Sequence, residues 1–95
     1  MSVYIIAQLT IADRDRYAKY EEGFMGIFDK YEGDLLSVDE DPTVMEGEWA
    51  ATRSVLIKFP SKEAAMAWWD SPEYQALAEH RRAASTINSF LVNGM

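Results

Sequence analysis

The sequence of 95 residues contains no cysteine. This absence excludes disulfides, thiolate metal ligands and cysteine nucleophiles together, so packing alone must hold the fold. No apolar run is long enough to span a bilayer, and the apolar N-terminal segment has neither a basic leader nor a small-residue cleavage site. A composition of 48% apolar and 26% charged residues predicts one soluble globular domain over residues 1–95, for which a cytoplasmic location is the default expectation.

Basic residues are scarce, and none occurs between Lys30 and Arg53. Sixteen acidic and nine basic side chains give a net charge of −7. This charge disfavours nucleic acid and anionic membrane surfaces as partners. The acidic stretch 32–48 lacks the spacing of a calcium-binding loop, and we interpret it as a solvated loop.

Motifs for nucleotide binding and for acyl transfer are missing as well. The sequence has no Gly-rich phosphate loop and no Ser, His and Asp in the order of a catalytic triad. His80 is the only histidine, and one imidazole with scattered carboxylates does not make a zinc site. We therefore expect neither a metal ion nor a cofactor.

The order of the expected elements is strand, helix, two strands, helix, strand. Their ranges are a strand at 3–9, a helix at 14–31 capped by Asp13, an interrupted strand at 35–38 and 44–46, a hairpin through Gly47 to a strand at 52–59, helices starting after the caps Ser61 and Ser71, and a strand at 86–92. This βαββαβ order predicts an α+β domain of the ferredoxin-like plan, an antiparallel sheet with helices on one face. Because the first strand is apolar on both sides, we expect the open face to pack on a second copy as a homodimer.

Several motifs carry a family resemblance over nearly the whole chain. They are the run Val44-Met45-Glu46-Gly47-Glu48-Trp49, then Arg53, the run Ser71-Pro72-Glu73-Tyr74, and Arg81. The chain resembles the bacterial family of unknown function numbered 1330. The resemblance implies the dimeric α+β barrel superfamily, which includes cofactor-free monooxygenases, muconolactone isomerases, haem peroxidases and ligand-sensing domains. It implies no particular reaction, and the acidic turn at 39–41 departs from the family pattern.

Two arginines are the candidate anchors for an acidic ligand. Arg53 shares a strand face with apolar residues, where it can hold a carboxylate inside a pocket or pair with Glu46 or Glu48 across the hairpin. Arg81 has the same ambiguity, with Glu46 or the second copy as its alternative partner. Glu46 therefore belongs to the candidate site.

Aromatic and titratable residues complete the candidate site. Trp49 and Trp68 are candidates for the pocket wall, although helical spacing also explains Trp68 as plain core packing. His80 and Tyr74 are the candidates for moving a proton, with a solvent-facing position as the alternative for His80.

Two functions follow from these residues. The first is a small-molecule binding protein, or an enzyme without cofactor, whose aromatic pocket holds a small aromatic or apolar acid. The second is a non-catalytic homodimeric interaction or structural module, with its aromatic residues used for folding and its acidic loop for solubility or docking.

Overall fold

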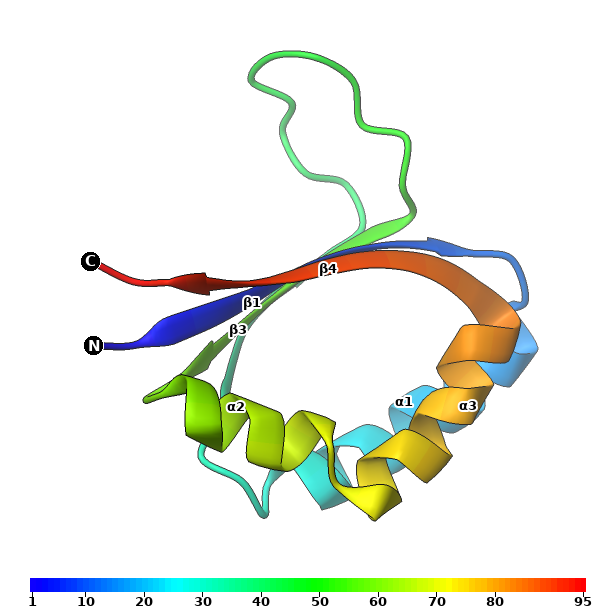
Figure 1. Ribbon diagram of the computed structural model, residues 1–95. Coiled ribbons are helices and arrows are strands. Elements are labelled where there is room, and N and C mark those ends of the chain that lie inside the picture. The colour runs from blue at the N-terminus through cyan, green and yellow to red at the C-terminus, as the bar shows by residue number, and fades with distance from the viewer.

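The sheet and its helices follow the expected order. The computed structural model describes residues 1–95 and contains β1 (Val3–Ile11), α1 (Arg14–Phe28), β2 (Asp34–Asp39), β3 (Arg53–Phe59), α2 (Lys62–Trp69), α3 (Pro72–Ala84) and β4 (Ser85–Asn93). The strands form one antiparallel sheet in the order β2-β3-β1-β4, and the three helices lie on one of its faces (Figure 1). This arrangement confirms the α+β, ferredoxin-like plan. None of the helices combines the length and the apolar character needed to cross a membrane.

The alternation of β1 decides which side chains face the helices. Its odd-numbered residues from Val3 to Leu9 are buried, while Ile6 on the other face is 39% exposed. The register places Leu9 opposite Arg53 and Ile5 opposite Ile57, so these β3 side chains point to the same inner face. The inner face of the sheet therefore carries an arginine at the end of an otherwise apolar row.

The helices begin at the caps that the sequence predicts. Side-chain oxygens of Asp13, Ser61 and Ser71 each accept a hydrogen bond from a backbone N–H three residues further on, at 3.0–3.2 Å. The Ser71 hydroxyl also donates to the carbonyl oxygen of Trp68 at 2.8 Å, which ties the end of α2 to the start of α3. This bond fixes the turn that brings Trp68 and Tyr74 side by side.

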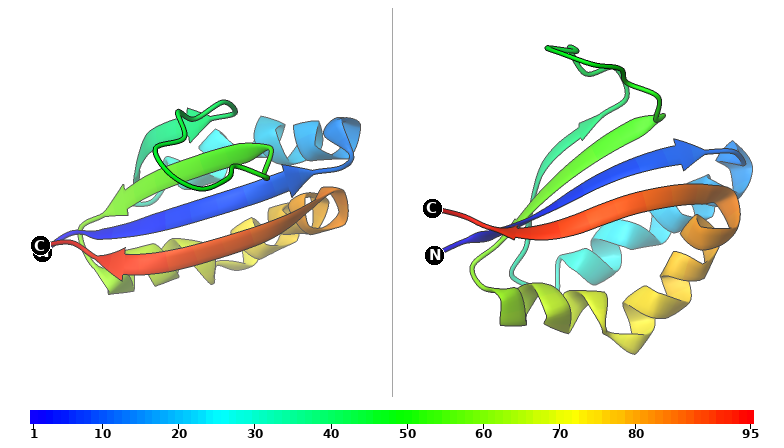
Figure 2. Two further views of the ribbon diagram at one scale, coloured as in Figure 1. Left: turned by 90° about the horizontal axis from the view of Figure 1, so that it is seen from above. Right: turned by 45° about the horizontal axis from the view of Figure 1, so that its top comes forward.

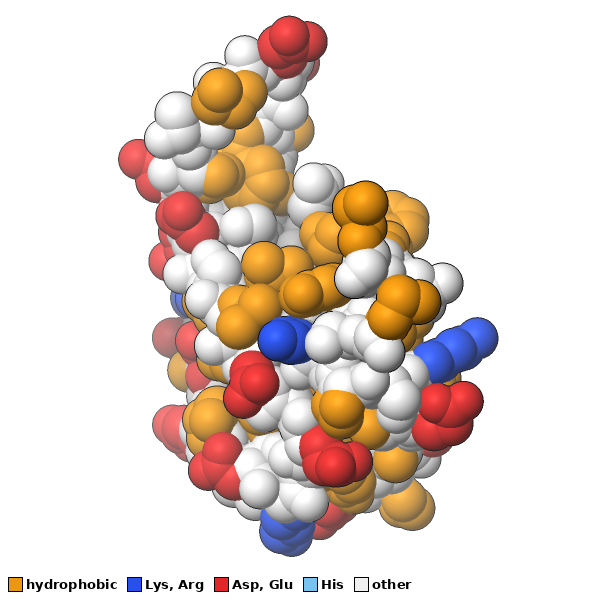
Figure 3. All heavy atoms as spheres, turned by 90° about the vertical axis from the view of Figure 1, so that its left-hand side faces the viewer, with side chains coloured by type: hydrophobic (Ala, Val, Ile, Leu, Met, Phe, Trp, Pro, Cys, Tyr) orange, Lys and Arg blue, Asp and Glu red, His pale blue; other side chains and the backbone are white.

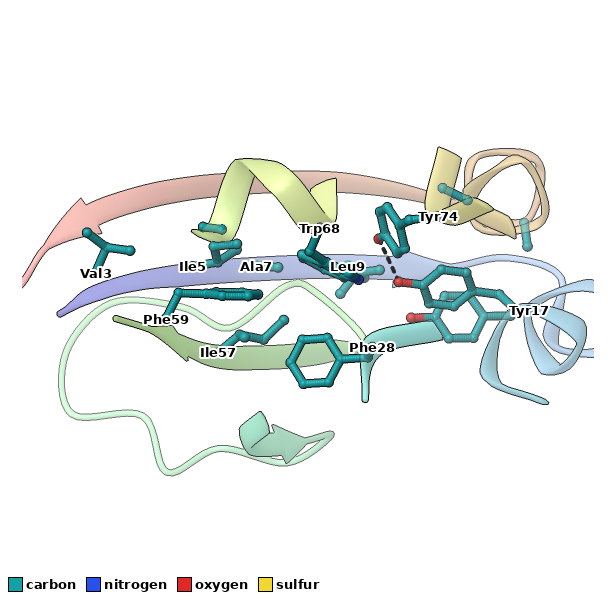
Figure 4. Packing of buried hydrophobic residues seen from close by; sticks show 14 residues of the cluster. Val3, Ile5, Ala7, Leu9, Tyr17, Phe28, Ile57, Phe59, Trp68 and Tyr74 are labelled. Carbon is teal, nitrogen blue, oxygen red and sulfur yellow. Dashed lines mark hydrogen bonds between the residues drawn. The ribbon is translucent and has the colours of Figure 1, made fainter. Parts of the chain in front are cut away.

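A ring of aromatic side chains around Trp68 forms the centre of the core (Figure 4). The Trp68 ring centroid lies 5.3 Å from that of Phe28, 5.7 Å from that of Phe59 and 4.3 Å from that of Tyr74. Edge and offset contacts of this kind stabilise a core beyond the area that they bury. Trp68 therefore joins α1, β3 and α3 at one point.

The region between β2 and β3 differs from the expectation. Residues 44–46 form no strand, and residues 40–52 make a long loop that stands out from the sheet on the side opposite the helices (Figures 1 and 2). Gly47 lies in this loop with a φ of +82°, a conformation that favours glycine. The predicted strand at 44–46 was wrong, because this acidic, Pro42-containing stretch has no strand beside it to supply ladder partners. β2 and β3 still pair as antiparallel neighbours, joined by the long loop through Gly47.

The first helix also ends earlier than expected, at Phe28 instead of residue 31. Its Gly23 lies against α3, since a Cβ atom built there would be only 2.7 Å from Cδ1 of Leu77. The glycine thus permits close packing of α1 on α3. At Gly26 the same construction meets nothing within 4 Å, so no neighbouring element approaches the helix closely there.

Candidate functional site

A cavity of ≈ 220 Å³ lies between the inner face of the sheet and the helices. Fifteen of its 19 lining residues are hydrophobic. The lining comprises Ile5, Ala7, Leu9, Tyr17, Tyr20, Glu21, Phe24, Met25, Leu35, Val38, Arg53, Val55, Ile57, Trp68, Trp69, Tyr74, Arg81, Ile87 and Ser89. Met25 of α1 and Val38 of β2 are 43% and 48% exposed, so the cavity opens between α1 and β2.

Arg53 is held at this cavity by acidic residues of other elements. Its Nη1 donates to Oε2 of Glu21 at 3.0 Å, and its Nη2 lies 3.5 Å from Oε2 of Glu40. Its guanidinium carbon lies 5.1 Å from the ring centroid of Tyr17. Glu40 also accepts a hydrogen bond from Arg14 at 2.8 Å, so the network links α1, the end of β2 and the start of β3.

The sequence-based expectation for the partners of Arg53 was therefore wrong. Neither Glu46 nor Glu48 pairs with it, because the loop at 40–52 stands away from the sheet. The carboxylates that replace them are 32 and 13 positions away in the chain, on α1 and just after β2. Their attraction holds the pKa of Arg53 above its ordinary value against the opposing effect of burial.

Arg81 of α3 has a different environment. The residue is only 4% exposed, and its guanidinium carbon lies 5.8 Å from the ring centroid of Tyr20 and 5.6 Å from that of Trp69. No carboxylate lies within ion-pair distance of it, and its Nε has no hydrogen-bond partner. The expected alternative, a pair with Glu46, is not formed within the chain. Since a guanidinium stays protonated in proteins, Arg81 is a buried cation facing aromatic rings alone.

Unpartnered donors gather at this cavity. Three buried side-chain polar atoms in the protein lack a hydrogen-bond partner, namely Nε of Arg53, Nε1 of Trp68 and Nε of Arg81. All three are N–H donors, and all three belong to residues that line the cavity. Because buried donors are normally satisfied, this common location of three donors without a partner in the chain distinguishes the cavity from the rest of the core.

A pair of phenols adds a further polar point to the apolar wall. The hydroxyl oxygens of Tyr20 and Tyr74 lie 2.8 Å apart in the buried interior, as the dashed line in Figure 4 shows. Burial is the main cause that raises the pKa of Tyr20 well above its ordinary value, and the interaction with Tyr74 adds to it. The positive charge of Arg81 opposes this shift. Tyr20 thus stays protonated over the whole physiological range, and the pair can donate one hydrogen bond outward.

Three candidate residues lie outside this cavity. His80 is half-buried between α3 and α1, where its Nδ1 accepts a hydrogen bond from Nε of Arg16 at 2.9 Å. Glu46 and Trp49 belong to the loop at 40–52, which lies on the opposite side of the sheet (Figure 1) and projects at the top of the molecule in Figure 3. Nowhere in the protein do three His, Asp or Glu side chains meet in a geometry that could hold a metal ion.

The structure brings together four candidate residues, Arg53, Arg81, Trp68 and Tyr74. It adds Tyr20 and Trp69, which the sequence analysis did not place at a site. The spacing of Tyr20 on α1 indicated a buried face, and the pair Trp68-Trp69 indicated a packed helix. Neither signal tells a ring in the core from a ring in a cavity wall.

Comparisons with known proteins agree with the resemblance seen in the sequence. Residues 2–95 match the family described as a domain of unknown function, DUF1330. No sequence among the curated proteins matches the chain.

The solved structures that resemble this one share its fold at low identity. A protein of unknown function from Rhodopseudomonas palustris superposes with a TM-score of 0.78 and 16% identity, covering 99% of this chain and 82% of that one. SnoaB, a cofactor-independent oxygenase from Streptomyces nogalater, gives a TM-score of 0.69 at 16% identity, with 99% and 93% covered. A dimeric ferredoxin-like protein of unknown function from Jannaschia sp. CCS1 also gives 0.69 at 16%, with 99% and 100% covered.

Proposed function

The chain belongs to the DUF1330 family, and we propose that it binds a small, mostly apolar carboxylic acid in the cavity between the helices and the sheet. The observation that carries this proposal is Arg81, a buried cation without an acidic partner. Moving an unpaired charge from water into a protein interior costs on the order of several kcal/mol of desolvation free energy. A carboxylate placed on the guanidinium offsets that cost and receives two parallel hydrogen bonds.

The rest of the cavity selects the body of the ligand. Its walls are aromatic and aliphatic side chains, against which an aromatic ring or a hydrocarbon is favoured over a polar group. Arg53 contributes less to charge recognition, because Glu21 and Glu40 already neutralise it. We therefore assign binding of the ligand carboxylate to Arg81. Trp68 forms part of the aromatic wall, and Arg53 shapes the cavity near its mouth.

The phenol pair supports a transformation of the bound acid without a cofactor. A hydroxyl of Tyr74 or Tyr20 is positioned to donate to a carbonyl oxygen of the ligand and to stabilise negative charge that develops there. The raised pKa of Tyr20 makes it a donor and not a base at neutral pH. SnoaB, which shares the fold, is described as a cofactor-independent oxygenase. In this scheme His80 has no part, because it lies outside the cavity.

Acid binding is tested by calorimetry with benzoate, cinnamate and 2-naphthoate, each paired with its neutral primary amide. We expect the acids to bind and the amides to bind at least tenfold more weakly. Arg81→Met should weaken acid binding about 10- to 100-fold, the range of a lost hydrogen bond to a charged group.

Arg82→Met is the matched control for this substitution. Arg82 is the exposed neighbour on the same helix, with its side chain bonded to Gln75, and we expect its replacement to leave acid binding unchanged. Equal binding of acids and amides, or an unchanged affinity in Arg81→Met, would refute the proposal. A folded protein that binds no acid would favour the alternative, a non-catalytic interaction module.

The outer face of the sheet supports a second proposal, that the protein is a homodimer. Phe90 and Val92 on this face are 59% and 39% exposed beside Ile6, an apolar surface on the side that no helix covers. The Jannaschia protein of the same fold is described as dimeric. Native mass spectrometry should give twice the chain mass, and Phe90→Asp should shift the protein to monomer. A wild-type monomer at micromolar concentration would exclude the dimer.

A further inference from the structure

A second cavity, of ≈ 230 Å³, lies between α2 and β4. Its walls are Ile5, Met66, Trp69, Ser89, Phe90 and Leu91. Three of these residues, Ile5, Trp69 and Ser89, also line the cavity that contains Arg81. The two cavities are therefore neighbours that share a wall.

The two cavities reach opposite edges of the sheet. The first opens between α1 and β2, and the second lies between α2 and β4, while β2 and β4 are the outermost strands of the order β2-β3-β1-β4. Figure 2 shows β2 with α1 along one edge and β4 with α2 along the other. Together the cavities extend across the molecule in the layer between sheet and helices.

The volumes favour one ligand that occupies both cavities. Small-molecule sites measure about 300–1,000 Å³. Cavities of ≈ 220 and ≈ 230 Å³ each fall below this range, whereas their combined volume lies within it.

The chemistry of the two cavities differs in a way that orients such a ligand. The first holds the unpartnered guanidinium of Arg81. The second is lined by Ile5, Met66, Trp69 and Leu91 with Ser89, together with Phe90, whose register with Ile6 places its side chain on the outer face. No charged residue lines it. A charged head is thus favoured in the first cavity and a hydrocarbon tail in the second.

Trp69 stands at the junction. Its ring lies 5.6 Å from the guanidinium carbon of Arg81 and 5.6 Å from the ring centroid of Tyr74 on the side of the first cavity, and it also lines the second. The side chain is only half-buried, and its carbonyl oxygen accepts a hydrogen bond from Gln75 that fixes the backbone without fixing the ring. The indole of Trp69 therefore forms part of the wall that the two cavities share.

We propose that the two cavities form one extended site, in which the carboxylate of a long-chain acid binds Arg81 and its apolar tail passes Trp69 to reach Met66 and Leu91. The ligand class is a carboxylic acid whose hydrocarbon chain is longer than the first cavity can hold. This inference rests on the proposed acid-binding function and names the kind of acid.

A series of straight-chain saturated acids with six to fourteen carbons tests the extended site, each measured by calorimetry below its micelle concentration. Each methylene buried in the wild-type protein should raise the affinity about fourfold. Met66→Trp fills the second cavity without touching the first. It should leave the six-carbon acid unaffected, stop the gain at a shorter chain, and weaken the longest acid at least tenfold.

Two further variants make the test decisive. Ala67→Trp adds the same indole to the exposed side of α2 and should leave the whole series unchanged. Leu91→Trp fills the second cavity from β4 and should repeat the effect of Met66→Trp, which covers the case in which one variant fails to fold.

The possible failures are distinguishable. An unchanged length dependence in both filled variants, with binding still lost in Arg81→Met, would overturn the extended site and leave the proposed function standing. Failure of every acid to bind the wild-type protein would overturn both.

Discussion

The two arginines of the cavity are the same residue type in opposite situations. Arg53 at the start of β3 has two carboxylates, Glu21 and Glu40, within ion-pair distance. Arg81 on α3 is more deeply buried and has two aromatic rings and no carboxylate. A paired guanidinium joins elements of the fold, whereas an unpaired buried guanidinium carries an uncompensated desolvation cost.

The difference follows from where each arginine meets the surface. Arg53 lies near the cavity mouth, where the half-exposed Glu21 of α1 can reach it from the solvent side. Arg81 lies against the rings of Tyr20 and Trp69, and no carboxylate is within ion-pair distance of it. The acidic excess of the protein therefore neutralises one cation and does not reach the other.

Replacing each arginine by methionine should give the largest difference in the free energy of unfolding between the two sites. Arg53→Met should lower the free energy of unfolding by about 1–2 kcal/mol, because it removes charge-assisted hydrogen bonds and packing on Tyr17. Arg81→Met should leave it unchanged or raise it by about 1 kcal/mol, because an uncompensated charge leaves the interior. Urea unfolding at pH 7 measures both. The reverse order would show that Arg81 is the structural residue.

A smaller effect concerns Tyr20, the ring on which Arg81 stacks. Because folding raises the pKa of Tyr20, its contribution to stability is fully present below about pH 10, the ordinary tyrosine value, and is lost as the pH rises through the folded-state value. Tyr20→Phe keeps the ring but breaks the hydroxyl pair, which should cost about 1 kcal/mol at pH 7. It should also make unfolding less sensitive to pH above 10.

Circular dichroism between pH 8 and 12 measures this dependence. Tyr4→Phe on the outer face of the sheet is the control, and we expect it to retain the alkaline sensitivity of the wild type. Identical alkaline profiles for Tyr20→Phe and the wild type would contradict the assignment.

The smallest effect concerns the acids around Arg53. The hydrogen bond from Arg14, helped by the nearby Arg53, lowers the pKa of Glu40. Its contribution to stability is therefore present above about pH 4.5, the ordinary value, and is lost as the pH falls below it. Glu40→Gln should slightly lower the melting temperature at pH 7 and leave it nearly unchanged at pH 3. Glu48→Gln, in the same loop, should have no effect at either pH.

Local signals in the sequence predicted much of the fold. The caps Asp13, Ser61 and Ser71 were confirmed, because a cap requires only a side chain and the next few backbone N–H groups. The strand predicted at 44–46 was wrong, because a strand needs a partner at the right distance and a short apolar run does not supply one.

The candidate site was predicted in part for a similar reason. Arg53, Arg81, Trp68 and Tyr74 were selected by residue type, and all four line one cavity. Glu46 was selected because it lies close to Arg53 in the chain, yet the loop carries it to the other side of the sheet. Nearness in sequence predicts contact only where a regular element or a tight turn joins the residues.

Residue periodicity predicts which side chains share a face of a strand or helix. Alternation along β3 places Arg53 on the same side as Ile57 and Phe59, and helical spacing places Tyr74, Ala78 and Arg81 on one side of α3. Backbone geometry fixes these periods, so the face of each side chain can be predicted from its position in the sequence. Which charges meet depends on how the elements pack. Glu21 pairs with Arg53 although 32 positions of the chain separate them, whereas no acidic side chain pairs with Arg81. The packing of α1 and α3 against the sheet thereby gave Arg53 two carboxylate partners and left Arg81 without one.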